Sequence, residues 1–148
     1  MRTIADLKIY MDYTLLRDVA TEPNDLGVMT YTESIALGHL AAAEERVNSL
    51  LAKHTTSAER DASALVTQWI CVYAMESLVA RRGKPIDGLR QRVADADRQI
   101  AAIQVGQATL SATDVAPFMI QTTLRDDEYK SDYFQSGQFT GLPEGDIQ

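Results

Sequence analysis

Apolar residues recur at three- and four-residue steps over residues 33–53, which predicts an amphipathic helix. Charged and small polar side chains occupy the opposite face. The sequence Thr30-Tyr31-Thr32-Glu33 is a possible capping box, the pattern of a helix start, so the helix is expected to open at Thr30 or Thr32. It is expected to end near Lys53 and His54, because cations suit the negative end of the helix dipole. The apolar stripe contains Leu40, Ala43, Val47 and Leu50, widened by Leu37 and Leu51.

The first residues of the chain have the pattern of a short helix. Thr3 and Asp6 have the spacing of a capping box, which places the helix start at Thr3. Residues 12–19 either continue this helix or form a second one. Residues 22–27 contain Pro, Asn, Asp and Gly, so they are expected to form a turn. The apolar face of the first helix is Ile4, Leu7 and Met11, with Tyr10 beside it.

A third helical segment is expected after Ser57, and it is apolar on nearly every side. A helix of this kind lies in the centre of a bundle, covered by several neighbours. The segment ends at a strong stop signal in residues 81–85, where basic residues are followed by Gly and Pro. The apolar residues include Leu65, Val66, Trp69, Ile70, Cys71, Val72, Tyr73, Met75, Leu78 and Val79.

The last helix is expected to start with Asp87 as N-cap and to end at Gly106. Its apolar positions form a narrow heptad-like seam at Leu89, Val93, Ala96, Ile100 and Ile103, which predicts one-sided packing. We therefore expect an all-α fold, a four-to-five-helix bundle with a long extended C-terminal arm. The core is expected to contain Leu40, Val47, Leu50, Leu65, Trp69, Ile70, Tyr73, Leu78, Val93, Ile100 and Ile103.

The helical periodicity stops after Leu110, which divides the chain into a body, residues 1–110, and an arm, residues 111–148. A structureless stretch of this length is unusual inside a compact domain. Its polar composition fits either a frayed tail or an arm that becomes ordered on a partner, and the sequence leaves both open. The candidate docking residues of the arm are Phe118, Tyr129, Tyr133, Phe134 and Phe139.

The charge of the chain is acidic and uneven. The net charge is −7, and the arm, with seven acidic and two basic residues, carries −5 of it. This argues against nucleic-acid binding by phosphate neutralisation, which needs a clustered basic surface. The chain lacks the run of about 18 apolar residues of a membrane helix, and its start does not resemble a signal peptide. We expect no membrane association and synthesis in the cytoplasm of the producing cell.

Residues that could carry chemistry are few and scattered. His39 and His54 lie 15 positions apart on one predicted helix, so they cannot share a ligand sphere. Adjacent carboxylates such as Glu44 and Glu45 point about 100° apart on a helix, so they do not face each other as a catalytic pair would. The single cysteine, Cys71, lies in an apolar run and is expected to be a buried hydrophobe. No phosphate loop, nucleophile–base pair or calcium loop is visible. We therefore expect no enzymatic activity, no metal and no cofactor.

The order of these features resembles the small helical head–tail adaptor (connector, or head-completion) proteins of tailed bacteriophages, in particular the Mu-like branch. The resemblance spans about residues 3–110. It rests on an opening Thr-Ile-Ala-Asp-Leu, a turn around Asp25 and a helix containing Ala-Ala-Glu-Glu-Arg-Val-Asn-Ser-Leu-Leu. It continues with a buried helix bearing Trp and Tyr. The last part is residues 92–103, Arg-Val-Ala-Asp-Ala-Asp-Arg-Gln-Ile-Ala-Ala-Ile, followed by Gly106 and Leu110.

This resemblance implies a structural virion protein in the neck, at the portal vertex. Such an adaptor forms a homo-oligomeric ring, expected to be dodecameric, under the portal protein. Its lower face receives a tail-completion, stopper or tail-terminator protein, and the genomic DNA passes through the channel without sequence-specific binding. The arm aromatics would dock on the portal, and the basic cluster Arg81, Arg82 and Lys84 would make ring or channel contacts. The alternative is a regulatory or toxin-neutralising interaction module whose tail wraps one partner.

Overall fold

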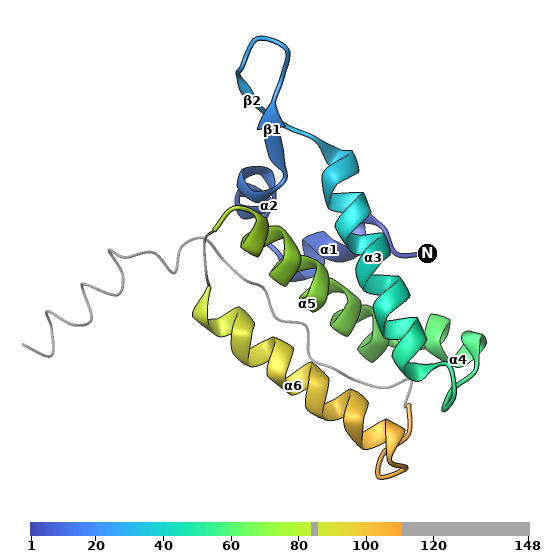
Figure 1. Cartoon of the computed structure of the whole chain (residues 1–148). Coiled ribbons are helices and arrows are strands. Elements are labelled where there is room, and N and C mark those ends of the chain that lie inside the picture. Colours follow the sequence, from blue (N-terminus) through green and yellow to red (C-terminus); the bar gives the residue numbers. More distant parts are fainter. Residues whose placement is uncertain (84–85, 111–148) are drawn as a thin grey trace, which may run out of the picture.

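Capping residues set the boundaries of the helices in this chain. The computed structural model describes residues 1–83 and 86–110, and this part of the chain contains six helices and one two-stranded antiparallel hairpin (Figure 1). The helices are therefore the dominant elements. In chain order the elements are α1 (Ile4–Tyr10), α2 (Tyr13–Val19), β1 (Thr21–Pro23), β2 (Met29–Tyr31), α3 (Glu33–Leu51), α4 (Ser57–Ala62), α5 (Ala64–Arg81) and α6 (Asp87–Gln104).

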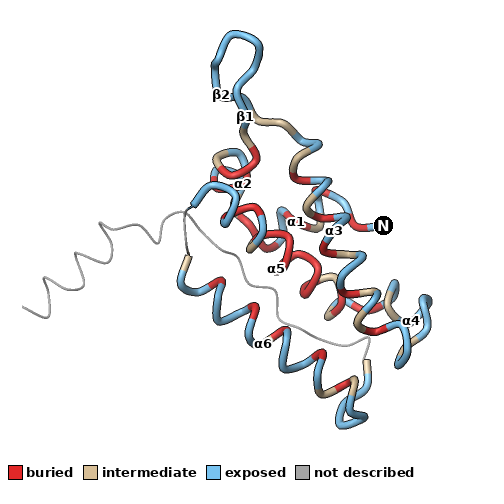
Figure 2. The backbone as a smooth tube through the Cα atoms, viewed as in Figure 1, coloured by how far each residue is buried: buried red, intermediate tan, exposed pale blue. Residues whose placement is uncertain are grey.

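Helix α5 lies at the centre of the body, as its all-round apolar sequence predicts. It packs against α3 and α6 along much of its length, and α1, α2 and α4 also contact it. Figure 2 shows α5 buried over most of its turns, whereas α3 and α6 are buried along one side. Trp69, Ile70 and Leu78 are among its fully buried or nearly fully buried side chains. The core thus forms around α5.

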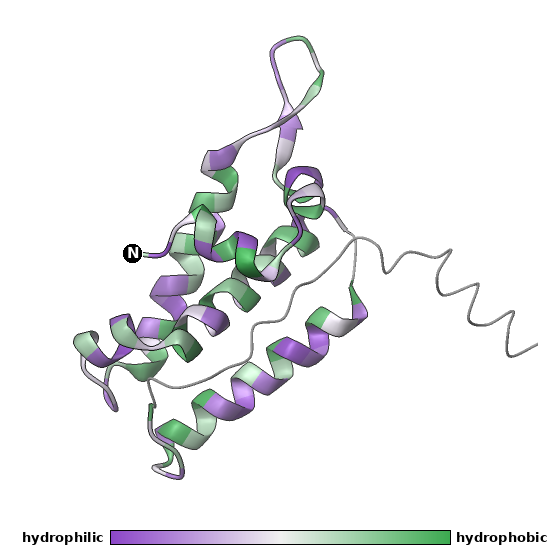
Figure 3. Ribbon diagram, turned by 180° about the vertical axis from the view of Figure 1, so that it is seen from behind, coloured by the Kyte–Doolittle hydropathy of each residue, from purple (hydrophilic) through white to green (hydrophobic). Residues whose placement is uncertain are grey.

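Helix α6 runs antiparallel to α5 and meets the body through one face (Figure 1). Its seam is buried, and hydrophilic residues cover its outer side (Figure 3). Beyond the helix, Gly106 takes a φ of 76°, a conformation that glycine adopts without strain. Gln107 N–H then donates to Ala102 O at 2.8 Å, so the chain turns back against the last turn of α6. Leu110 is half-buried and packs against the core.

The β1–β2 hairpin extends away from the helices at one end of the body (Figure 1). Thr21 pairs with Tyr31 and Pro23 pairs with Met29. In the connecting loop, the Asn24 side-chain oxygen accepts hydrogen bonds from the backbone N–H groups of Leu26 and Val28 at 2.9 and 3.0 Å. An asparagine in this role is a common way to satisfy the backbone of a turn.

Arg2 ties the start of the chain to three helices. Its side chain is only 8% exposed, although it carries a full charge. Its guanidinium donates to Thr67 Oγ1 at 3.0 Å, to Arg60 O at 2.9 Å and to Asp61 Oδ1 at 3.4 Å. Glu44 Oε1 lies 3.6 Å away on α3. The planar guanidinium can serve several acceptors at once, which explains how this buried cation is tolerated.

The mostly helical fold agrees with the sequence, but the count of four to five helices was too low. The third predicted segment is two helices, α4 and α5, because the chain at Ser63 is extended and its hydroxyl caps α5 by accepting from Val66 N–H at 3.3 Å. Of residues 12–19, Asp12 is the N-cap and Tyr13–Val19 form the separate helix α2. The predicted turn at residues 22–27 lies within a hairpin whose strands were not predicted.

Thr32 is the N-cap of α3, which is one of the two predicted starts; the other, Thr30, belongs to β2. One boundary and two core positions differ from the prediction. Helix α6 has Ile86 rather than Asp87 as N-cap. All expected core residues are buried except Leu50 and Leu65, which are half-buried and pack against the core cluster. Both are near helix ends, where fewer elements cover a side chain.

The arm residues lie outside the described part of the chain. This applies to Phe118, Tyr129, Tyr133, Phe134 and Phe139, and also to Lys84. The division into a body and an arm therefore stays a prediction. Within residues 1–83 and 86–110, no helix combines the length and the apolar character needed to cross a membrane.

Candidate protein–protein interface

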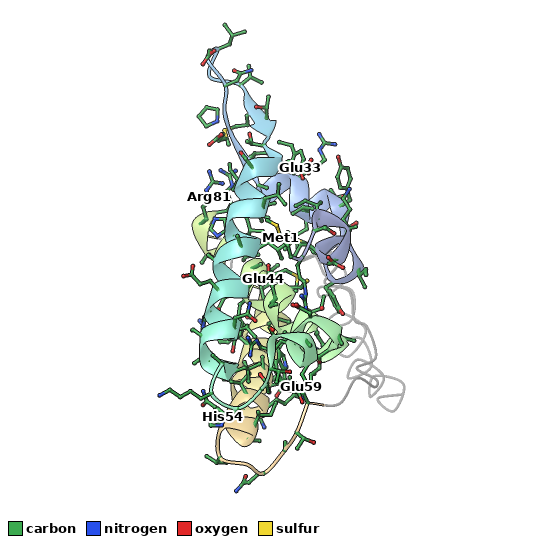
Figure 4. All side chains as sticks on the ribbon, turned by 90° about the vertical axis from the view of Figure 1, so that its right-hand side faces the viewer. Met1, Glu33, Glu44, His54, Glu59 and Arg81 are labelled. Carbon is green, nitrogen blue, oxygen red and sulfur yellow. The ribbon has the colours of Figure 1, made fainter. Side chains whose placement is uncertain are left out.

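The hairpin tip is the first candidate interface. Its apolar side chains face solvent: Leu26 is 86% exposed, Val28 56% and Met29 46%. Figure 4 shows the tip standing clear of the helices, with its side chains pointing outward. Three neighbouring exposed apolar residues on a projecting element are a feature of binding surfaces, because their burial by a partner releases free energy.

The base of the hairpin is fixed to the helices. The Arg81 guanidinium donates from Nη1 to Val19 O at 3.2 Å and to Thr21 O at 3.1 Å, and Figure 4 shows Arg81 at this base. Thr32 N–H donates to Ala20 O at 2.9 Å on the other side. Arg81, predicted as a ring contact, therefore holds the hairpin base within its own chain. Arg82 is exposed.

The second candidate interface is a groove between α5 and α6, formed by two hollows that lie end to end along the helix pair. The first hollow, of about 230 Å³, lies beside residues 92–99, in the middle of α6, and beside the first turns of α5. The second, of about 270 Å³, lies near the N-terminal end of α6. Residues lining the first include Gln68, Trp69, Val72, Arg92, Arg98 and Gln99. Residues lining the second include Glu76, Val79, Ala80, Ile86, Leu89 and Arg90.

Gln68 gives the first hollow an unusual chemical feature. Its side chain is only 7% exposed, and among the described residues its Oε1 has no hydrogen-bond partner. A buried acceptor without a donor costs about 1–3 kcal/mol of folding free energy. Its neighbour Trp69 is satisfied, because the indole Nε1–H donates to Gln99 Oε1 at 2.8 Å. The hollow therefore contains one buried acceptor that lacks a donor.

Tyr73 and Cys71 are two further ionisable residues buried on α5. The Tyr73 hydroxyl donates to Asp97 Oδ1, and the Arg46 guanidinium carbon lies 4.0 Å from the centre of the Tyr73 ring. Burial is the main cause that raises the pKa of Tyr73, followed by the hydrogen bond to Asp97. Burial raises the pKa of the fully buried Cys71 thiol to about 12. Tyr73 and Cys71 therefore stay protonated at neutral pH.

The candidate chemical residues do not converge. His39 on α3 contacts Ser77 on α5 through Nδ1 at 2.6 Å, and burial is the main cause that lowers its pKa. His54 lies in the exposed turn after α3, at the end of the body opposite the hairpin (Figure 4). Glu44 faces Arg2, whereas Glu45 is exposed. Within the described residues, no group of three or more His, Cys, Asp or Glu side chains could hold a metal ion.

Neither the family models, nor the curated proteins, nor the solved structures that were compared with this chain give a match.

The two candidate interfaces were not predicted from the sequence. For the hairpin a signal exists: a turn sequence, Asn24-Asp25-Leu26-Gly27, lies between short segments containing Thr, Val and Tyr, which favour strands. The groove has no such signal, because it depends on how α5 and α6 pack, which brings together Gln68 and Gln99 in the first hollow and Val79 and Leu89 in the second.

Proposed function

We propose that this chain is a structural head–tail adaptor of a tailed bacteriophage. In this proposal it forms a ring under the portal and joins the DNA-filled head to the tail. The exposed apolar tip of the hairpin carries the assembly part of the proposal, since such a surface is best explained by burial against another chain. The choice of a phage neck as the assembly rests on the resemblance of residues 3–110 to phage adaptors.

A ring closes when one surface of each copy meets a different surface of the next copy. A projecting hairpin suits this geometry, because it reaches beyond its own body and is fixed at its base by Arg81. The outer face of α6 is polar and does not offer an apolar surface. We therefore assign the neighbour contact to Leu26, Val28 and Met29 rather than to α6, whose seam is already filled by its own chain.

The charge of the chain supports the role of a channel component. Of the net charge of −7, the arm carries −5 and residues 1–110 carry −2, so the body has no excess of positive charge to hold DNA by counterion release. The proposed partners are further copies of the chain, the portal protein and a tail-completion, stopper or tail-terminator protein. In this proposal the protein is non-catalytic, resides in the virion neck and uses its arm to dock on the portal.

The decisive test is a cryo-electron microscopy reconstruction of the virions of the source phage, focused on the portal vertex. We expect a ring of helical density below the portal, with each hairpin touching the adjacent copy. Absence of the chain from purified virions would reject the adaptor proposal. The alternative, a regulatory or toxin-neutralising module, would then be pursued by isolating the partner that the arm wraps.

A double substitution at the hairpin tip should separate assembly from folding. Leu26→Asp with Val28→Asp adds charge at solvent-exposed positions, so the free energy of unfolding should change by less than about 0.5 kcal/mol. Ring formation, measured by sedimentation velocity and negative-stain microscopy, should be lost because charges would be buried between copies. Val105→Asp is the matched control, since Val105 is 67% exposed at the opposite end of the body. Rings that persist in the double variant would remove the hairpin from the interface.

A further inference from the structure

The α5/α6 groove ends close to the point where the described chain ends. Trp69 on α5 bonds to Gln99 on α6, so the N-terminal end of α5 lies beside the C-terminal end of α6. At this end the chain leaves α6, turns back at Gly106 and reaches the half-buried Leu110. Gln104 Nε2 donates to Leu50 O at 3.0 Å and fixes the same end to α3. The arm therefore starts at the end of the groove that contains Gln68.

We propose that residues 111–120, the first part of the arm, bind in an extended conformation along the α5/α6 groove of their own chain. This inference concerns the isolated protein, and it does not depend on the adaptor function.

The length of this segment matches the groove. From Gln99 to Ile86 the axis of α6 covers about 20 Å at roughly 1.5 Å per residue. An extended chain advances about 3.3 Å per residue, so six residues beyond Leu110 cover the same distance. Phe118 is therefore within reach of the second hollow, beside Val79 and Leu89.

The order of polar and apolar residues in the segment also matches the groove. The segment begins with Ser111, Thr113 and Asp114, and it continues with Val115, Ala116, Pro117, Phe118, Met119 and Ile120. The groove, followed from the same end, begins with a hollow lined mainly by polar side chains, although Trp69, Val72 and Ala96 also line it. It continues to a hollow lined mainly by apolar residues, with Glu76 and Arg90 at its edge. The polar start of the segment thus meets the more polar hollow, and its apolar part meets the more apolar one.

The segment supplies the groups that the first hollow requires. An extended chain has backbone N–H groups that no helix has used, and one of them can donate to Gln68 Oε1, the buried acceptor without a partner. The hydroxyl groups of Ser111 and Thr113 are further donors. Asp114 carries a negative charge into a hollow lined by Arg92, Asp95 and Arg98. Arg98 pairs with Asp95, so the hollow has two cations and one carboxylate before the segment binds.

This binding divides the arm into two parts. Residues 111–120, including Phe118, cover the body, whereas the later part keeps its aromatic residues for another protein. The aromatic residues left for a partner are Tyr129, Tyr133, Phe134 and Phe139.

Hydrogen–deuterium exchange of the full chain, followed by mass spectrometry, tests the proposal. Amides of residues 111–120 should exchange at least about tenfold more slowly than amides of residues 126–148, because bound backbone N–H groups are protected. The same protection should be seen over a hundredfold range of protein concentration. Equal exchange in both parts would overturn the proposal. Protection that disappears on dilution would also overturn it, since the groove would then be filled by a second copy.

A pair of substitutions in the segment provides a second test. In the full chain, Val115→Asp with Phe118→Asp should release the segment, so the protection of residues 111–120 should be lost. Tyr133→Asp with Phe139→Asp is the matched control and should leave this protection unchanged. Unchanged protection in the first variant would contradict the assignment of these two residues to the groove.

Discussion

Ile100→Asp should destabilise the body by at least about 4 kcal/mol, which is a large part of the stability of a domain of this size. Ile100 is 3% exposed and lies in the α6 seam that faces α5 and α3. The substitution removes a buried aliphatic side chain, which costs about 2–4 kcal/mol. It also forces a carboxyl group either to be buried without a partner or to push α6 away from the body. Urea unfolding followed by circular dichroism would measure the loss.

The control for this prediction is Ala101→Asp, which adds the same group one residue further along α6. Ala101 is exposed, so its cost should stay below about 1 kcal/mol and should come mainly from the unfavourable helix dipole. If both variants unfolded at the same urea concentration as the parent chain, α6 would not pack on the body through Ile100 as described.

Arg2→Ala should cost about 2–3 kcal/mol, although the residue lies close to the end of the chain. The substitution leaves Thr67 Oγ1 and Arg60 O without their charged donor, and it removes the cation that faces the half-buried Glu44. Asp61 should contribute little, because its side chain is 68% exposed and water can replace the pair. Thermal and urea unfolding of the purified variant would give the value.

Arg2→Lys separates the charge from the geometry of the guanidinium. A lysine keeps the charge near Glu44, but its single ammonium group cannot reach all the acceptors of the guanidinium fork. It should recover less than half of the loss. Lys8→Ala, which removes an exposed cation near the Tyr13 ring, should change stability by less than about 0.5 kcal/mol. If Arg2→Ala lowered the free energy of unfolding by less than about 0.5 kcal/mol, the buried Arg2 network would make no net contribution to stability.

The parts of the fold that the sequence predicted are those set by local patterns. The α6 seam was visible because a regular three- and four-residue spacing has one structural solution. The start at Thr3 was visible because Asp6 accepts the backbone N–H of Thr3 at 2.7 Å, a contact within one turn of helix. Long apolar helices with clear stop signals, such as α5, were predicted for the same reason.

The parts that could not be predicted depend on contacts between distant segments. The break at Ser63 depends on a single hydroxyl in a sequence that otherwise suits one continuous helix. The Arg2 network joins residues about 60 positions apart, and a lone arginine near a chain start has no local pattern that indicates burial. The same applies to Gln68, whose burial in the α5/α6 groove has no local signal in the sequence.

The hairpin was missed for an energetic reason. Two strands of three residues each are marginal by themselves, so propensity alone does not favour them over a plain loop. The two hydrogen bonds from Arg81 and the Thr32–Ala20 contact add the support that the strands lack. The candidate interface at the tip thus depends on a residue about 50 positions away in the sequence.

The burial of Cys71 makes the native protein unreactive toward thiol reagents, since its single thiol is enclosed in the core and protonated at neutral pH. Oxidation therefore cannot link folded copies through it. Any cysteine introduced on the surface becomes the sole reactive thiol of the folded chain. A dye or spin label placed in this way at the hairpin tip would report distances between neighbouring copies without replacing a native residue of the core.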